Sequence, residues 1–280
     1  MENIIITPAV GMHAREVVLF LGSLRKFYND KVLFFVGKND HELKRTLKYY
    51  ECLYEDVSVH KHDAVNKRYS LLISFLKQNS NLKKVFFCDS RDIYFQSNPF
   101  NFSYEGLLNF FSEDVKIKDC NVNSKWMKNT LGLRVFDELK EKFVICCGTV
   151  MGNTDAIANY AKQMNLMSKK FPYLWYRKKI KYLLTFRRDK EGRACDQPYA
   201  AYLIHKNYLK NIKVYSNTSG PIATVYPLNN FNFDNKNQLL NDKGDPYVVV
   251  HQYDKKWNEF RDRVKLIKKN FDINVGTLDI

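Results

Sequence analysis

The first hundred residues alternate between short apolar runs and longer amphipathic stretches. Runs rich in β-branched and aromatic residues predict four strands, at 3–7, 31–37, 57–60 and 84–88. Apolar residues at helical spacing predict the helices between them, at 13–28, 40–50 and 63–79. This alternation predicts an α/β fold, in which helices flank a mixed, mostly parallel sheet.

The second half of the chain is less regular but contains the same kinds of pattern. It predicts further strands at 143–152, 213–217, 223–227 and 245–254. It also predicts helices at 153–167, 196–206 and 257–269. Because neither an internal repeat nor a linker interrupts the pattern, we expect one domain over residues 1–280.

One apolar run is followed directly by charged residues. Val85 to Cys88 reads as a buried strand, and it is followed at once by Asp89, Ser90, Arg91 and Asp92. Ligands of parallel sheets bind beyond the carboxyl ends of the strands, and two such carboxylates can converge on Mg²⁺ or Mn²⁺. That cation would clamp a diphosphate. The alternative is an acidic turn in which Asp92 pairs with Arg91 or caps a helix.

Composition and charge limit which kinds of ligand the protein could bind, but they do not choose among them. The chain is 45% hydrophobic with a formal net charge of +15, which favours nucleic acid, anionic membranes or phosphorylated ligands. No run approaches the ~20 apolar residues of a membrane span, and the N-terminus lacks a basic signal-peptide region. Six cysteines without a Cys-x-x-Cys pair predict reduced thiols. We therefore expect a cytoplasmic protein.

Two motif classes are absent, and two rival functions stay open. The sequence lacks both G-x-G-x-x-G after the first strand and G-x-x-x-x-G-K-[ST], which argues against Rossmann dehydrogenases and P-loop enzymes. A phosphatase with an aspartate nucleophile would carry Asp-x-Asp, whereas the spacing here is Asp-x-x-Asp. A basic nucleic-acid-binding module without catalysis is the other alternative.

Several segments together resemble one enzyme family. VFFCDSRDIYFQSNPF, at 85–100, resembles the metal-binding stretch of GT-A fold glycosyltransferases. Further segments are similar to that family in the same order, namely FLGSLRKF, NKRYSLLISFLKQ, CCGTVMGNTDAI, ACDQPYAAYL and VVVHQYDKKW. The resemblance spans about residues 3–257 and is nearest to bacterial and viral members with Asp-x-Arg-Asp and His-Gln-Tyr-Asp motifs. It is distantly similar to the glycogenin-like branch.

The resemblance implies a metal site and a nucleotide-sugar site. Asp89, Asp92 and His251 would bind Mn²⁺ or Mg²⁺, although the extra residue between the two acids leaves open which of them is the ligand. Residues 1–100 would bind the donor, and 101–280 the acceptor. The expected nucleotide-sugar contacts are Thr7, Ala9 and Gly37 near the base, Arg68 and Lys255 near the phosphates, Asp89 near the ribose if it does not bind the metal, Gly148 with Gly152 near the sugar, and Ser90.

The resemblance also implies two catalytic candidates. Asp196 would be the general base of an inverting enzyme, whereas Gln197 would lie near the anomeric carbon in a retaining one. Asp196 can instead simply cap the helix that follows. Cys146-Cys147-Gly148 stands where the family has Asn-Ser-Gly, so an asparagine contact to the donor sugar is missing.

The expected reaction moves a sugar from a UDP- or GDP-linked donor to a hydroxyl of a glycan, glycolipid or protein. The basic, aromatic segment 169–193 is interpreted in three ways: contact with an anionic membrane at its inner face, a loop that binds the acceptor, or an ordinary basic surface loop. We expect no specific nucleic-acid partner.

Overall fold

A seven-stranded sheet joins the two halves of the chain in the computed structural model, which describes residues 2–60, 63–171 and 196–269. The strand order is β3-β2-β1-β4-β7-β6-β8. β7 runs antiparallel to β4 and β6, and the other pairs are parallel. The strands are β1 (Glu2–Pro8), β2 (Lys31–Gly37), β3 (Leu53–Val57), β4 (Leu82–Cys88), β6 (Leu108–Lys116), β7 (Phe143–Asn153) and β8 (Ile212–Tyr215). The predicted α/β class with a mostly parallel mixed sheet is confirmed.

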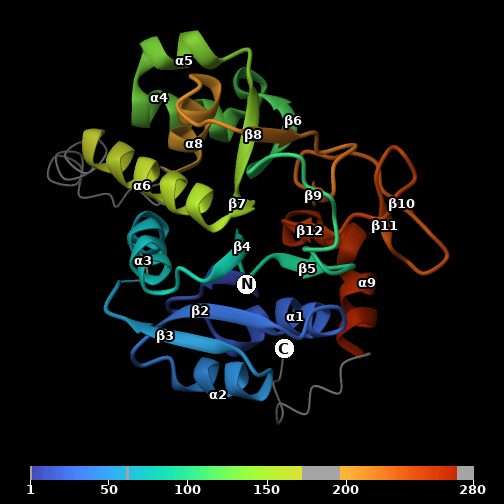
Figure 1. The fold of residues 1–280 in the computed structure, drawn as a ribbon. Coiled ribbons are helices and arrows are strands. Elements are labelled where there is room, and N and C mark those ends of the chain that lie inside the picture. Colours follow the sequence, from blue (N-terminus) through green and yellow to red (C-terminus); the bar gives the residue numbers. More distant parts are fainter. Residues whose placement is uncertain (1, 61–62, 172–195, 270–280) are drawn as a thin grey trace, which may run out of the picture.

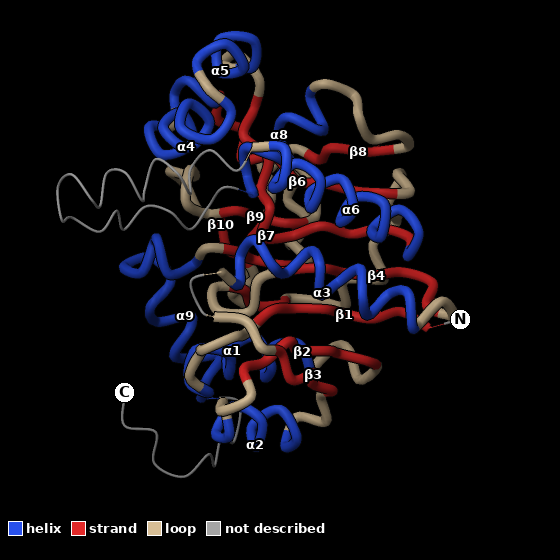
Figure 2. Tube along the Cα trace, turned by 90° about the vertical axis from the view of Figure 1, so that its left-hand side faces the viewer, coloured by secondary structure: helices blue, strands red, loops and turns tan. Residues whose placement is uncertain are grey.

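Helices cover both faces of this sheet. α3 (Ala64–Gln78) and α6 (Thr154–Lys170) lie side by side on one face, together with α8 (Asp196–His205) (Figure 2). α1 (Ala14–Arg25) and α2 (His41–Tyr49) pack on the opposite face (Figure 1). Strand alternation explains the two cores, because Val85 and Phe87 face the α3 side while Phe86 and Cys88 face the α1 side.

A second, smaller sheet lies beside the carboxyl end of β4. Its order is β5-β12-β9, from β5 (Ile93–Phe95), β12 (Val249–His251) and β9 (Ile222–Thr224). β12 pairs antiparallel with β5, so that His251 stands opposite Ile93. This pairing brings β12 next to the acidic turn that follows β4.

The remaining helices and strands lie around these two sheets. α4 and α5 lie at one end of the molecule, and α9 lies beside the small sheet (Figure 1). Their bounds are α4 (Asn121–Leu131), α5 (Leu133–Leu139), α9 (Trp257–Lys269), β10 (Asn232–Phe233), β11 (Leu239–Leu240), η1 (Ile117–Asp119) and η2 (Tyr253–Lys256). Among the described helices, none has both the length and the apolar character needed to cross a membrane.

The structure corrects the prediction in two places. The strand predicted at 57–60 is wrong, since β3 spans Leu53–Val57. β3 is the edge strand of the sheet and is largely exposed, so its charged residues hide the apolar signal. The sequence analysis also assigned no elements to 101–142, where β6, α4 and α5 lie. The five described cysteines are free and buried, whereas Cys195 and most of the segment 169–193 lie outside the described residues.

A buried serine fastens α1 to the small sheet, and it provides a test of this arrangement. The Ser23 hydroxyl accepts the Phe95 N–H at 3.0 Å and donates to the Leu19 carbonyl at 2.7 Å. Ser23→Ala leaves the Phe95 donor unpaired, so we expect the free energy of unfolding to fall by about 1–3 kcal/mol in urea titrations. Ser80→Ala, in an exposed loop, is the control. Equal effects of the two substitutions would contradict the arrangement.

Candidate functional site

Two carboxylates and one imidazole meet where the two sheets join. Asp89 and Asp92 follow β4, and His251 ends β12. The Nε2 atom of His251 lies 3.8 Å from Asp89 Oδ2 and 3.5 Å from Asp92 Oδ1. One potential ligand atom from each residue lies within 4.8 Å of the others. Asp92 and His251 are buried, whereas the Asp89 side chain is 37% exposed, so the cluster reaches solvent at Asp89.

Backbone pairing holds the three residues in register. The Gln252 N–H donates to the Asp92 carbonyl at 2.8 Å, directly after the β5–β12 ladder. Gln252 itself has a φ of 61°, in the left-handed region that non-glycine residues rarely occupy. The Tyr253 hydroxyl donates to the Arg91 carbonyl at 3.2 Å. These contacts fix the turn after β4 against the turn after β12.

Gly148 makes room for the cluster. The Asp89 N–H donates to the Gly148 carbonyl at 2.8 Å, which places the Cα of the glycine against both side chains. A Cβ atom at this position would overlap Cε1 of His251 and would lie 2.7 Å from its Nε2 and 2.8 Å from Asp89 Oδ2. Only glycine therefore lets the carboxylate and the imidazole approach each other here.

The other ring nitrogen of His251 is already occupied. Its Nδ1 lies 3.3 Å from Cys146 Sγ, which turns Nε2 toward the two carboxylates. Burial disfavours the imidazolium, but its interactions with the Cys146 sulfur and the Asp92 carboxylate outweigh burial and raise the pKa of His251. Burial also opposes ionisation of Asp92, yet the charge and hydrogen bond of His251 lower the pKa of that carboxyl overall. A cation bound here would take the place of the imidazole proton.

This set of donors fits a divalent cation. Two carboxylates and a neutral imidazole match the ligand preferences of Mn²⁺, and Mg²⁺ prefers the oxygen ligands. Three protein ligands leave coordination positions for water or for the oxygens of a phosphorylated ligand. The opening at Asp89 gives such a ligand access from solvent.

A buried arginine connects Asp89 to α8. Arg68 Nη1 donates to Asp89 Oδ1 at 2.7 Å, and Nη2 pairs with the carboxylate of Asp196 and donates to the Cys147 carbonyl at 3.0 Å. Burial disfavours the guanidinium charge, but Tyr69, Asp196 and Asp89 outweigh it and raise the pKa of Arg68. Arg68 was predicted to contact phosphates, and the structure places it between two carboxylates.

The two catalytic candidates have different surroundings. Asp196 Oδ2 accepts hydrogen bonds from Arg68 and from the Tyr69 hydroxyl, while Oδ1 accepts the Gln197 N–H at 3.0 Å. Both oxygens of Asp196 are therefore engaged. The side chain of Gln197 donates through Nε2 to Glu113 Oε1 at 2.8 Å. Glu113 is not among the residues predicted from the sequence, although an acid within the apolar run LLNFFSEDV is the signal that marks it.

The residues expected near the nucleotide lie along the same edge of the large sheet. Thr7 and Ala9 lie at the end of β1, and Ser90 Oγ donates to the Pro8 carbonyl at 3.1 Å. Thr7 Oγ1 is buried and has no hydrogen-bond partner within the described part of the chain. These residues thus lie together with Asp89 at the carboxyl ends of neighbouring strands.

An aspartate that the sequence analysis missed joins the first two loops. Asp40 Oδ2 accepts the Gly37 N–H at 2.8 Å and the Gly11 N–H at 3.0 Å, linking the loops after β1 and β2. Gly37, which was predicted to approach the nucleotide base, therefore lies against Asp40. Lys255 is about half exposed and lies 3.6 Å from Asp254, whose carboxylate also pairs with Arg91 of the acidic turn at 3.4 Å.

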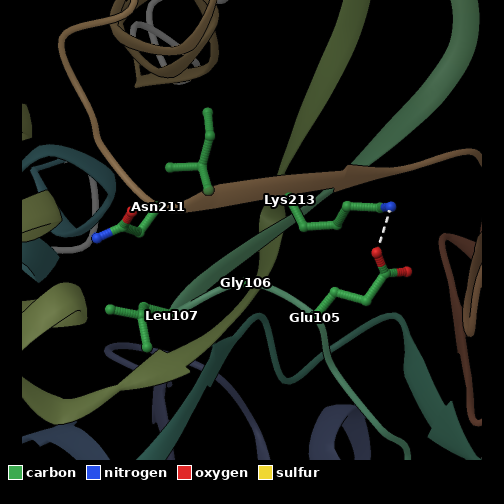
Figure 3. A pocket seen from close by; sticks show the side chains of 6 residues that line it. Glu105, Gly106, Leu107, Asn211 and Lys213 are labelled. Carbon is green, nitrogen blue, oxygen red and sulfur yellow. Dashed lines mark hydrogen bonds and ion pairs between the residues drawn. The ribbon is translucent and has the colours of Figure 1, made fainter.

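Two features lie away from this site. Gly152 pairs with Val85 and Leu108, four residues along β7 from Gly148 and hence about 13 Å away. A surface hollow of about 520 Å³ lies at the same distant edge, where the Lys213 ammonium pairs with Glu105 at 2.6 Å (Figure 3). Neither feature adjoins the acidic cluster.

The role of Gly148 can be tested with a matched substitution on the same strand. Gly148→Ala and Gly152→Ala both overfill the sheet, since a Cβ at 152 would lie 2.8 Å from the Leu107 carbonyl oxygen. We expect both variants to lose about 1–3 kcal/mol of stability. Only Gly148→Ala should also lose Mn²⁺ binding, measured by calorimetry. Equal retention of Mn²⁺ by the two variants would remove the cluster as the site.

A scan of protein-family models finds no match to this chain, and a search of the curated proteins finds none.

Proposed function

We propose that this protein is a metal-dependent glycosyltransferase of the GT-A type. It would move a sugar from a UDP- or GDP-linked donor to a hydroxyl of a glycan, glycolipid or protein. The observation that supports this proposal best is the convergence of Asp89, Asp92 and His251 at the carboxyl edge of the sheet. The same edge carries Thr7, Ala9 and Ser90, so a nucleotide there would place its diphosphate beside the cluster.

The metal would be held by Asp89, Asp92 and His251. When bound, it supplies positive charge that stabilises the departing diphosphate. His251 must be neutral to serve as a ligand, and Cys146 at its Nδ1 keeps Nε2 directed at the site. Asp92 and His251 are buried, so these two ligands are fixed before any nucleotide binds.

The protein's own side chains would orient the donor sugar. Arg68 holds Asp89 and Asp196 in one network, so the metal site and the first turn of α8 are positioned together. Both oxygens of the Asp196 carboxylate already accept hydrogen bonds. This residue is therefore better suited to orienting its neighbours than to accepting a proton. Gln197, which is partly exposed, donates its backbone N–H to that carboxylate and its side-chain amide to Glu113.

A thermal-shift experiment with UDP and GDP, each with and without Mn²⁺, tests this function. A ligand at 100 times its Kd adds about 2.7 kcal/mol to stability, which is roughly 5–10 °C for a chain of this size. We expect a shift that requires both nucleotide and metal. Salt-sensitive RNA or DNA binding without such a shift would favour the nucleic-acid-binding module, and hydrolysis of phosphate monoesters would favour the phosphatase.

A further inference from the structure

A carboxyl group that the proposed mechanism has not used lies buried at the carboxyl end of β6. Glu113 is 4% exposed and follows the apolar residues Phe110 and Phe111 in the strand. Its hydrogen-bond partner within the described chain is the neutral amide of Gln197, at 2.8 Å. Burial raises the pKa of Glu113, with the Gln197 hydrogen bond and the charge of His251 opposing it. A buried carboxyl without an arginine or lysine partner among the described residues weakens the fold, so its presence needs another reason.

The backbone around Glu113 is irregular in a way that fixes its direction. The β6–β7 register shifts between Ser112 and Lys116, and Asp114 has a φ of 53°. The Asp114 carboxylate anchors this irregularity, because it accepts the Ser216 hydroxyl at 2.5 Å and the Thr218 N–H at 3.0 Å. Bulges of this kind re-aim side chains next to active sites, and strained residues gather at such sites.

The chemistry of the Glu113–Gln197 pair determines which way the amide faces. An ionised carboxylate only accepts hydrogen bonds, so it selects the Nε2 end of the Gln197 side chain. The reversed amide would place two oxygens against each other. Oε1 of Gln197 is therefore directed away from Glu113. The neighbouring Asp196 has both carboxylate oxygens engaged, which leaves Oε1 as the available acceptor of this turn.

We propose that Glu113 is a positioning residue for sugar transfer, which acts by orienting the carboxamide of Gln197. The inference rests on the proposed glycosyltransferase function and deepens it. The hydrogen bond from Gln197 Nε2 to Glu113 would direct Gln197 Oε1 to the reacting sugar carbon, where an oxygen stabilises the positive charge that develops as the bond to the diphosphate breaks. Glu113 itself does not need to touch the substrate.

A double-mutant cycle tests the inference on the full chain with Mn²⁺. Turnover is measured as release of UDP or GDP, with water as the acceptor of the sugar, from UDP-glucose, UDP-galactose, UDP-N-acetylglucosamine and GDP-mannose, and the fastest donor is used for the cycle. We expect Glu113→Gln to lower kcat by about 10–100-fold, as loss of an orienting partner does, with the donor KM nearly unchanged. In the Gln197→Ala background, Glu113→Gln should lower kcat no further.

Stability provides a readout that does not depend on activity. Glu113→Gln can pair with either end of the Gln197 amide, so it no longer selects one orientation, but it keeps a hydrogen bond and removes a buried carboxyl; we therefore expect its Tm at pH 7 to equal or exceed that of the parent. Its Mn²⁺-dependent shift with UDP or GDP should match the parent. Glu141→Gln, on a carboxylate that is 55% exposed, is the control and should leave kcat unchanged.

Two results separate failure of the inference from failure of the proposed function. If the parent turns over a donor but the losses of Glu113→Gln and Gln197→Ala multiply, or Glu113→Gln retains full kcat, the positioning role is wrong and the transferase function stands. If the parent neither binds UDP or GDP with Mn²⁺ nor turns over any donor, the proposed function fails and the inference fails with it.

Discussion

Asp92→Asn and His251→Ala are each expected to abolish the Mn²⁺-dependent binding of UDP or GDP. Each substitution removes one of three ligands that lie within 4.8 Å of one another, and neither lost ligand has a replacement in the cluster. We expect the apparent Kd for the nucleotide in the presence of Mn²⁺ to rise by at least about 100-fold, which corresponds to about 2.7 kcal/mol. Isothermal titration calorimetry with and without Mn²⁺ measures it.

Asp262→Asn is the matched control for the aspartate substitution. Asp262 lies on α9, its side chain is 85% exposed, and its loss changes the net charge by the same amount. We expect this variant to bind Mn²⁺ and nucleotide like the parent. Parent-like affinity in both Asp92→Asn and His251→Ala would show that the cluster does not bind the metal.

Arg68→Met is expected to cause the largest loss of stability among these substitutions. The guanidinium compensates two carboxylates, Asp89 and Asp196, and the Asp196 side chain is only 6% exposed. Removal of one partner of a buried ion pair leaves an uncompensated charge and costs about 3–5 kcal/mol. Urea unfolding of the metal-free protein measures this loss.

Two further variants show whether the charge of Arg68 is the cause. Arg134→Met, at a side chain that is 93% exposed, should change stability by less than about 0.5 kcal/mol. The double variant Arg68→Met/Asp196→Leu should regain part of the loss, because it removes the buried carboxylate as well. If the double variant were less stable than Arg68→Met, packing rather than charge would explain the effect.

The Arg68 network also links metal binding to the first turn of α8. Asp89 is shared between the cluster and Arg68, and Arg68 in turn holds Asp196 beside Gln197. A cation that draws Asp89 Oδ2 into its coordination shell leaves Oδ1 on the guanidinium. A metal bound at the cluster would therefore be connected to Asp196 and Gln197 through one hydrogen-bonded network.

Local chemistry within the sequence determined the elements of the first half and the place of the acids. Buried strands at 31–37 and 84–88 are continuous apolar runs, and the charges that follow Cys88 mark the strand end. Strand–helix alternation then directs those ends to one edge of the sheet. Edge strand β3 escaped this reasoning because an exposed strand has no reason to be apolar.

Contacts between distant segments were decided only by the tertiary structure. The sequence placed Arg68 on a helix, but its pairing with Asp196, 128 residues away, depends on how α3 and α8 pack. The resemblance suggested His251 as a ligand, and the β5–β12 ladder is what brings it to Asp92. Only the tertiary structure identified Glu113 and Asp40, through the hydrogen bonds that they accept from the Gln197 side chain and from glycine N–H groups. Periodicity reports which face of an element is buried, whereas the identity of the partner across that face depends on how separate segments pack together.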